Sequence, residues 1–100
     1  MSKLVTLNFS QKENGIFESQ PVQIGGNFAL HLTFSEENKE HNSIGVYRSA
    51  TGQDFVRCFR SDWFAPRFDR TFGDAVSGMY IKITTSVQPA GGSMLCEGLE

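Results

Sequence analysis

The chain has 100 residues, the size of one domain, so it has no room for a catalytic domain joined to a separate binding domain. Hydrophobic residues make up 39 % of it, and nine Phe, two Tyr and one Trp supply bulky side chains for one core, which excludes an intrinsically disordered chain. Nine basic and eleven acidic side chains give a net charge of −2, so the composition disfavours nucleic acid as a partner.

Neither a membrane span nor an export signal is predicted. No apolar run comes near the roughly 20 residues that cross a bilayer. The first three residues lead into an alternating segment, without the apolar stretch of about 7–15 residues that a secretory signal contains. We therefore expect synthesis in the cytoplasm and no membrane partner. Leu99 and Glu100 resemble a vector-derived tail, which leaves one domain over residues 1–98.

Alternation of apolar and polar residues with a period of two dominates the chain and is typical of half-buried β-strands. In chain order, the predicted strands are residues 5–9, 16–24 with a break at Pro21, 28–34, 44–47, 55–59, 79–87 and 94–96. Residues 50–53 lie between the fourth and fifth of these and form a predicted hairpin loop.

Short strands separated by Gly, Asn and Pro predict an all-β fold, an antiparallel β-sandwich of jelly-roll-like arrangement with seven or eight strands. At most one short helical turn is expected. It falls either at residues 65–68, since Pro66 suits a first helical position and Phe68 and Phe72 are four apart, or at residues 35–38. The side chains expected to face inward are Val5, Leu7, Phe9, Ile24, Phe28, Leu30, Leu32, Phe34, Ile44, Val46, Ile81 and Ile83.

The groups that carry most enzyme chemistry are few and scattered. Cys58 and Cys96 lie in alternating apolar stretches, which predicts free, buried thiols and no disulfide. His31, expected to face outward from its strand, and His41, in a polar loop, form no close-set pair with either cysteine, whereas structural zinc sites usually contain such a pair. We therefore expect no metal, no cofactor and no enzymatic activity.

All five arginines fall between Arg48 and Arg70, and aromatic residues are interleaved with them. Arginine and aromatic side chains are enriched at the energetic centres of protein interfaces. The candidate binding surface comprises Tyr47, Arg48, Arg57, Arg60, Trp63, Phe64, Arg67 and Arg70. The same pattern has a second interpretation, in which the phenylalanines fill the core and the aspartates pair with the arginines within the chain; those aspartates are Asp54, Asp62 and Asp69.

Two segments, residues 15–24 and 78–89, resemble parts of small β-sandwich proteins encoded by gut-bacterial phages and prophages. Proteins of that kind are virion or assembly components without catalytic activity. The resemblance therefore implies an assembly role and a place in a virion, but it carries no functional residue over to this chain.

Three kinds of function remain open from the residues. The leading hypothesis is a non-enzymatic structural or interaction module that acts by protein–protein contact or by self-association. The first alternative is a carbohydrate-binding module that uses Trp63, Tyr47 and nearby Arg and Asp groups. The second alternative is single-stranded nucleic-acid binding, in which the aromatic rings stack on bases and the arginines contact phosphates.

Overall fold

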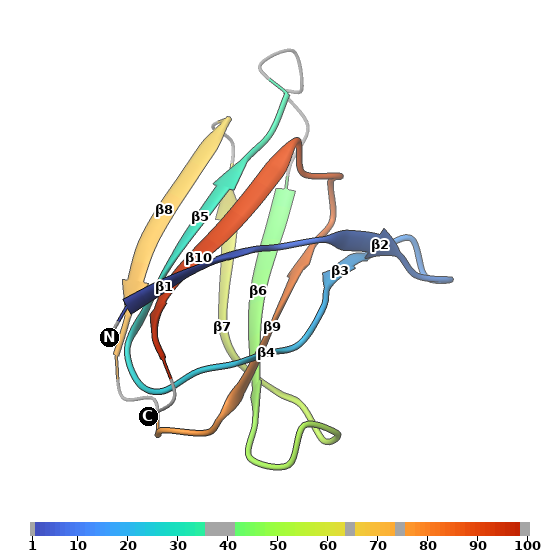
Figure 1. Cartoon of the computed structure of the whole chain (residues 1–100). Coiled ribbons are helices and arrows are strands. Elements are labelled where there is room, and N and C mark those ends of the chain that lie inside the picture. Colours follow the sequence, from blue (N-terminus) through green and yellow to red (C-terminus); the bar gives the residue numbers. More distant parts are fainter. Residues whose placement is uncertain (1, 36–41, 64–65, 74–75, 99–100) are drawn as a thin grey trace.

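Two antiparallel β-sheets stack face to face, and their facing rows of apolar side chains form the core (Figure 1). The computed structural model describes residues 2–35, 42–63, 66–73 and 76–98, and of Trp63 it describes the backbone. This arrangement confirms the predicted all-β antiparallel sandwich, and the predicted tail at Leu99 and Glu100 lies outside the described residues.

The described residues form ten strands instead of the expected seven or eight. One sheet, sheet A, has four strands in the order β1-β10-β5-β8. The other, sheet B, has six strands: β2-β3-β9-β6-β7 in order, with β4 also paired to β9. The strands are β1 (Ser2–Thr6), β2 (Phe9–Gln11), β3 (Phe17–Ser19), β4 (Val22–Gln23), β5 (Phe28–Thr33), β6 (Asn42–Ser49), β7 (Val56–Trp63), β8 (Arg67–Phe72), β9 (Tyr80–Thr85) and β10 (Gly91–Glu97).

The first predicted strand, residues 5–9, is divided because the chain crosses there from sheet A to sheet B. At the crossing Leu7 is buried, and its N–H donates to the Gly92 carbonyl at 2.9 Å. The Gln20 side chain hydrogen-bonds to the backbone of the two residues that flank Leu7. Its Oε1 accepts from Asn8 N and its Nε2 donates to Thr6 O, both at 2.8 Å. The alternation of apolar residues continues through the crossing, so the pattern alone does not reveal it.

The predicted helical turn at residues 65–68 is wrong for Arg67 and Phe68, which begin strand β8. Strand β8 pairs antiparallel with β5, and this pairing places Phe68 opposite Leu32 and Phe72 opposite Phe28. A spacing of four residues puts two side chains on one face of a strand as well as on one face of a helix. The other suggested turn, at residues 35–38, lies outside the described residues beyond Ser35.

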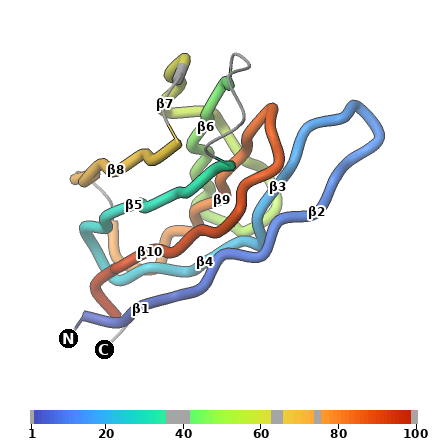
Figure 2. Tube along the Cα trace, turned by 90° about the horizontal axis from the view of Figure 1, so that it is seen from above, coloured from blue at the N-terminus to red at the C-terminus, as the bar shows by residue number. Residues whose placement is uncertain are grey.

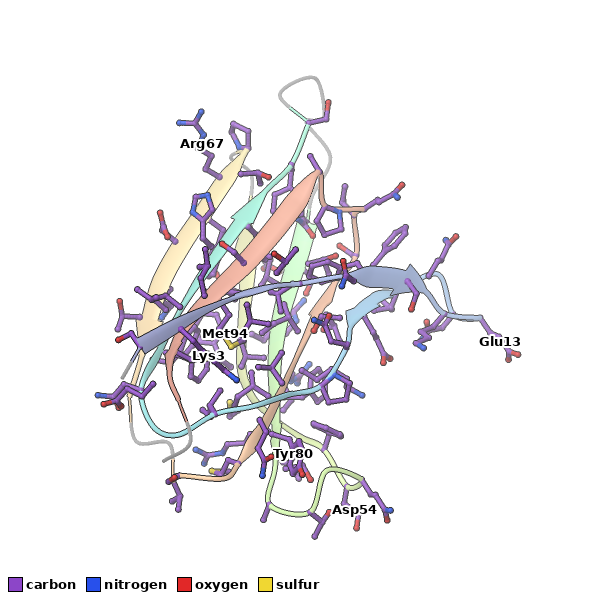
Figure 3. The ribbon with its side chains drawn as sticks, in the orientation of Figure 1. Lys3, Glu13, Asp54, Arg67, Tyr80 and Met94 are labelled. Atoms are coloured by element: carbon purple, nitrogen blue, oxygen red, sulfur yellow. The ribbon has the colours of Figure 1, made fainter. Side chains whose placement is uncertain are left out.

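The predicted inward set is confirmed. Ten of its twelve members are buried, and the other two, Val5 and Phe9, are partly buried and pack against the core. The core also contains four residues that were not in the predicted set: Val22, Phe68, Met94 and Cys96. Met94 has no exposed surface, and Figure 3 shows where it lies on β10. The inner faces of both sheets therefore contribute to one continuous core.

The break at Pro21 divides the predicted strand 16–24 into β3 and β4, which both pair with β9. At the break the side chain of the buried Ser19 supplies a hydrogen-bond acceptor for the backbone N–H of Ile83 on β9. Its Oγ accepts from Ile83 N at 2.9 Å and donates to Gln20 O at 3.1 Å. The serine side chain thus keeps a central strand of sheet B hydrogen-bonded where the neighbouring strand is interrupted.

Replacing Ser19 by alanine is expected to lower the free energy of unfolding by about 1–3 kcal/mol, because it leaves the Ile83 N–H buried without an acceptor. Urea denaturation followed by circular dichroism measures the change. Ser10→Ala, at an exposed serine of the adjacent strand β2, is the matched control and is expected to stay within about 0.5 kcal/mol of the parent. Equal losses in the two variants would contradict this role of Ser19.

Candidate functional site

The arginine- and aromatic-rich segment, residues 48–72, does not form one surface. Part of it closes the core along the side where β7 of sheet B and β8 of sheet A are the edge strands. There the Phe59 ring meets Phe72 edge-on at a centroid distance of 5.2 Å and lies 6.4 Å from Phe68. Arg70 lies in the inward row of β8, with its guanidinium carbon 4.6 Å from the centre of the Phe59 ring. This part of the segment follows the second interpretation, in which aromatic residues fill the core.

Arg48 and Arg67 are exposed but do not share a sheet face with Arg57 and Arg60. Arg48 stands opposite the buried Ile81 in the pairing of β6 with β9, so it belongs to the inner row of sheet B, near the β6–β7 loop. Figure 3 shows Arg67 at the opposite end of the sandwich from Asp54 of that loop. The predicted contributions of the Trp63 side chain and of Phe64 lie outside the described residues.

The remaining predicted residues, Tyr47, Arg57 and Arg60, do come together, on the outer face of sheet B. Directly paired residues of neighbouring strands point to the same side of a sheet. The register therefore lines up two rows across this face. One row runs from β7 to β3 as Arg60, Gly45, Thr84 and Glu18, and the other runs from β7 to β9 as Arg57, Tyr47 and Lys82.

These two rows, with Asn14, Ile16 and Ser43, line a depression of about 250 Å³, which we call the outer-face depression. Gly45 lies at its floor and is itself buried, because the side chains of Thr84 and Tyr47 close over it. A Cβ atom at this position would come within 2.7 Å of Thr84 Oγ1 and 3.3 Å of Tyr47 Cε1. Glycine thus allows these two side chains to pack against the β6 backbone.

Lys82 and Glu18 form the far wall of the depression. Lys82 Nζ lies 3.3 Å from Glu18 Oε1, and both side chains are about three-quarters buried, with 21 % and 25 % of their surface exposed. The ammonium group also lies 4.6 Å from the centre of the Phe55 ring and 5.8 Å from that of Tyr47. It is therefore held between two aromatic rings and a carboxylate, an arrangement that fixes its position.

A second depression, of about 520 Å³, adjoins the first and shares Glu18 and Lys82 with it. Phe55, Gln53, Phe9 and Pro21 contribute to its lining. The β2–β3 hairpin, which projects from the body of the sandwich in Figure 2, borders both depressions. Together they form a broad concave surface across the outer face of sheet B.

The charges on this surface are unevenly partnered. Lys82 pairs with Glu18, and Arg60 NH2 lies 3.2 Å from Asp62 Oδ1. Within the part of the chain that the structure describes, Arg57 has no such ion-pair partner, and its side chain is exposed. Arg57 is thus an exposed cation beside the Tyr47 ring, available to an acceptor from another molecule.

The two cysteines lie in different environments. Both thiols are free, as expected, but the prediction that both are buried is wrong for Cys58, which is exposed. Cys58 falls at the irregularity in the β6–β7 ladder, where Val46 pairs with Phe59 and Tyr47 with Arg57. The resulting β-bulge turns Cys58 out of the regular alternation. Cys96 is buried in the core, and burial raises the pKa of its thiol while the charge of Lys3 lowers it less.

His31 faces outward from sheet A, as predicted, and its Nδ1 lies 3.1 Å from Asp69 Oδ2. His41 lies outside the described residues. No group of three His, Cys, Asp or Glu side chains that could hold a metal ion occurs among residues 2–35, 42–63, 66–73 and 76–98.

No protein-family model, curated protein or solved structure matches this chain. In the portion that the structure describes, no helix is long and apolar enough to cross a membrane. The candidate site is therefore defined by its geometry alone: a depression with one available arginine and a lysine held between two rings.

Proposed function

We propose that the protein is a non-enzymatic interaction module that binds a protein partner on the outer face of sheet B. The observation that carries this proposal is the exposed Arg57, which lies beside Tyr47 in the outer-face depression and has no ion-pair partner among the described residues. An arginine guanidinium presents a planar fork of donors that matches a carboxylate, so the proposed partner places an Asp or Glu side chain against Arg57.

The shape of the surface supports a protein partner over a sugar. Stacking on a sugar requires a free aromatic face. Tyr47 is half-buried, with its ring edge beside Gly45 and the Lys82 ammonium 5.8 Å from its centre. The two adjoining depressions extend across several strands and can accommodate an extended segment of another chain.

The charges favour a protein over single-stranded nucleic acid. A nucleic-acid groove tracks a phosphate backbone with a series of available cations. Here Lys82 and Arg60 already face the carboxylates of Glu18 and Asp62, which leaves Arg57 as the available cation of the outer-face depression. The exposed Lys12 is a second available cation, in the lining of the adjoining depression, and two cations do not form such a series. The resemblance of two strand segments to small phage β-sandwich proteins agrees with a role in protein assembly.

A random peptide library selected on the immobilised protein tests the proposal. We expect the selected peptides to contain Asp or Glu and to bind at least tenfold more weakly to Arg57→Ala, because a charge-assisted hydrogen bond contributes about 1.5–3 kcal/mol.

Arg48→Ala is the matched control, since Arg48 is an exposed arginine of the same sheet but belongs to its inner row. It is expected to leave the affinity unchanged. Peptides without acidic residues, or peptides that bind equally well to Arg57→Ala, would refute the proposal. A glycan array and a salt titration with single-stranded oligonucleotides, each compared with Arg57→Ala, would show whether a sugar or a nucleic acid uses the same face.

A further inference from the structure

The open edges of the two sheets differ in how they are protected. An edge strand presents unpaired backbone groups, and proteins block it with short strands, bulges or charged side chains that point inward. Sheet A has β1 and β8 as its edges, and the inward rows of these strands contain Lys3, opposite the buried Cys96, and Arg70. Sheet B has the short strands β2 and β4, of three and two residues, on one side and β7 on the other. These features protect every edge strand of the described residues except β7.

Strand β7 has less protection. It is eight residues long, and a bulge at Cys58 interrupts only its first part. The remaining stretch, Phe59 to Trp63, pairs regularly with β6 on one side. Its inner row contains Phe59 and Ser61 and no charged residue, whereas Arg60 and Asp62 point outward beside Gly45 and Ser43. On the other side of this stretch no strand of the described residues pairs with β7, which makes it an edge of sheet B.

We propose that two copies of the protein pair through this edge, β7 against β7 in antiparallel orientation, with Ser61 on the two-fold axis. In a two-fold antiparallel pair centred on Ser61, Arg60 of each copy lies opposite Asp62 of the other. Opposite charges that face each other directly across two strands stabilise their pairing. Arg60 and Asp62 already lie 3.2 Å apart within one copy, on one face and about half exposed, so they can exchange partners when two copies meet.

Other positions of the two-fold axis along β7 are unfavourable. Centring on Arg60 or on Asp62 places two like charges directly opposite each other, which destabilises a strand pair. Centring between two residues places an inward side chain opposite an outward one, which the pleat of a sheet does not allow. Centring on Phe59 brings the bulge at Cys58 into the contact. The Ser61 register is therefore selected by both charge and pleat.

This pairing rests on the edge of sheet B and does not depend on the proposed function. It joins two sheets B into one continuous sheet, with the two-fold axis perpendicular to it. Both outer-face depressions then lie on the same side of the joined sheet. A partner with two binding segments would engage both, and its second segment would bind at a raised effective concentration.

Charge reversal tests the pairing. Light scattering on a size-exclusion column, at several loading concentrations, is expected to show a dimer of the full chain. Arg60→Asp and Asp62→Arg each place two like-charged pairs across the axis, and each is expected to weaken dimerisation at least tenfold. The double variant Arg60→Asp, Asp62→Arg restores both opposite pairs and is expected to recover the dimer. Circular dichroism verifies that every variant is folded.

A cross-link tests the register. In a Cys58→Ala background, Ser61→Cys is expected to form a disulfide-linked dimer on mild oxidation, since residues directly opposite have Cβ atoms about 4.5–5.5 Å apart. Val56→Cys, on the same strand but outside the register, is the control and is expected to stay unlinked. A strict monomer at the highest concentration would overturn the proposal. So would a dimer that tolerates both single charge reversals, or one that Leu95→Asp, on the outer face of sheet A, disrupts instead.

Discussion

Leu30→Ala is expected to reduce the free energy of unfolding by about 2–5 kcal/mol and to lower Tm by about 10–30 °C. Leu30 has no exposed surface and lies on β5, between Met94 of β10 and the inward row of β8. Truncating it leaves a cavity at the centre of sheet A that the neighbouring strands cannot close without moving apart. Thermal unfolding followed by circular dichroism measures the loss.

Leu95→Ala provides a matched control on the adjacent strand β10. Leu95 is 49 % exposed and points to the outer face of sheet A, so the same truncation is expected to cost less than about 1 kcal/mol. A shift of one residue in register would exchange the inward and outward rows of a strand. Equal losses in Leu30→Ala and Leu95→Ala would therefore show that the register of sheet A is different.

Phe59→Ala is the second variant with a large expected effect, a loss of about 3 kcal/mol in the free energy of unfolding. The ring of Phe59 comes from sheet B and packs against Phe68 and Phe72 of sheet A, with the Arg70 guanidinium over it. Removing it opens the core between the two edge strands and exposes both partner rings. Urea denaturation measures the loss, and increased binding of a hydrophobic dye to the folded protein reports the exposed rings.

Phe55→Ala is the control for ring removal. The Phe55 ring contacts the Lys82 ammonium on the outer face of sheet B instead of the core, and its loss is expected to cost about 1 kcal/mol. Phe59→Leu keeps apolar volume at the edge and is expected to recover part of the lost stability. If Phe59→Ala were as stable as Phe55→Ala, the two edge strands would not be joined by Phe59.

Much of the fold is predictable from the sequence because one face of each long strand is buried. In β5 and β9 this burial imposes strict alternation, visible from Phe28 to Phe34 and around Ile81 and Ile83. Strand β8 is harder, because Phe68 and Phe72 suit a helix and a strand equally well and Arg70 lies between them in the inward row. Its strand conformation is determined by pairing with β5, which the local pattern does not encode.

The candidate site is predictable only in part. Tyr47, Arg57 and Arg60 are close together in the sequence, on the two strands of one hairpin. The local enrichment in arginine and aromatic residues is therefore enough to predict them. Glu18 and Lys82 were not predicted. They are 64 residues apart and meet because β3 pairs with β9, which is a property of strand order. A glycine inside an alternating strand often marks a close approach to its backbone, and at Gly45 the approaching groups are the side chains of Thr84 and Tyr47.

The pairing of β1 with β10 has a practical consequence. Ser2 lies opposite Glu97, so the outer ends of the first and last strands are neighbours on sheet A, at one end of the sandwich (Figure 1). A short linker can join them in a circular permutant, with new ends opened in the β6–β7 loop. Fusion tags placed at either original end emerge beside sheet A and leave the opposite layer, with Tyr47 and Arg57, clear for attachment to a sensor surface.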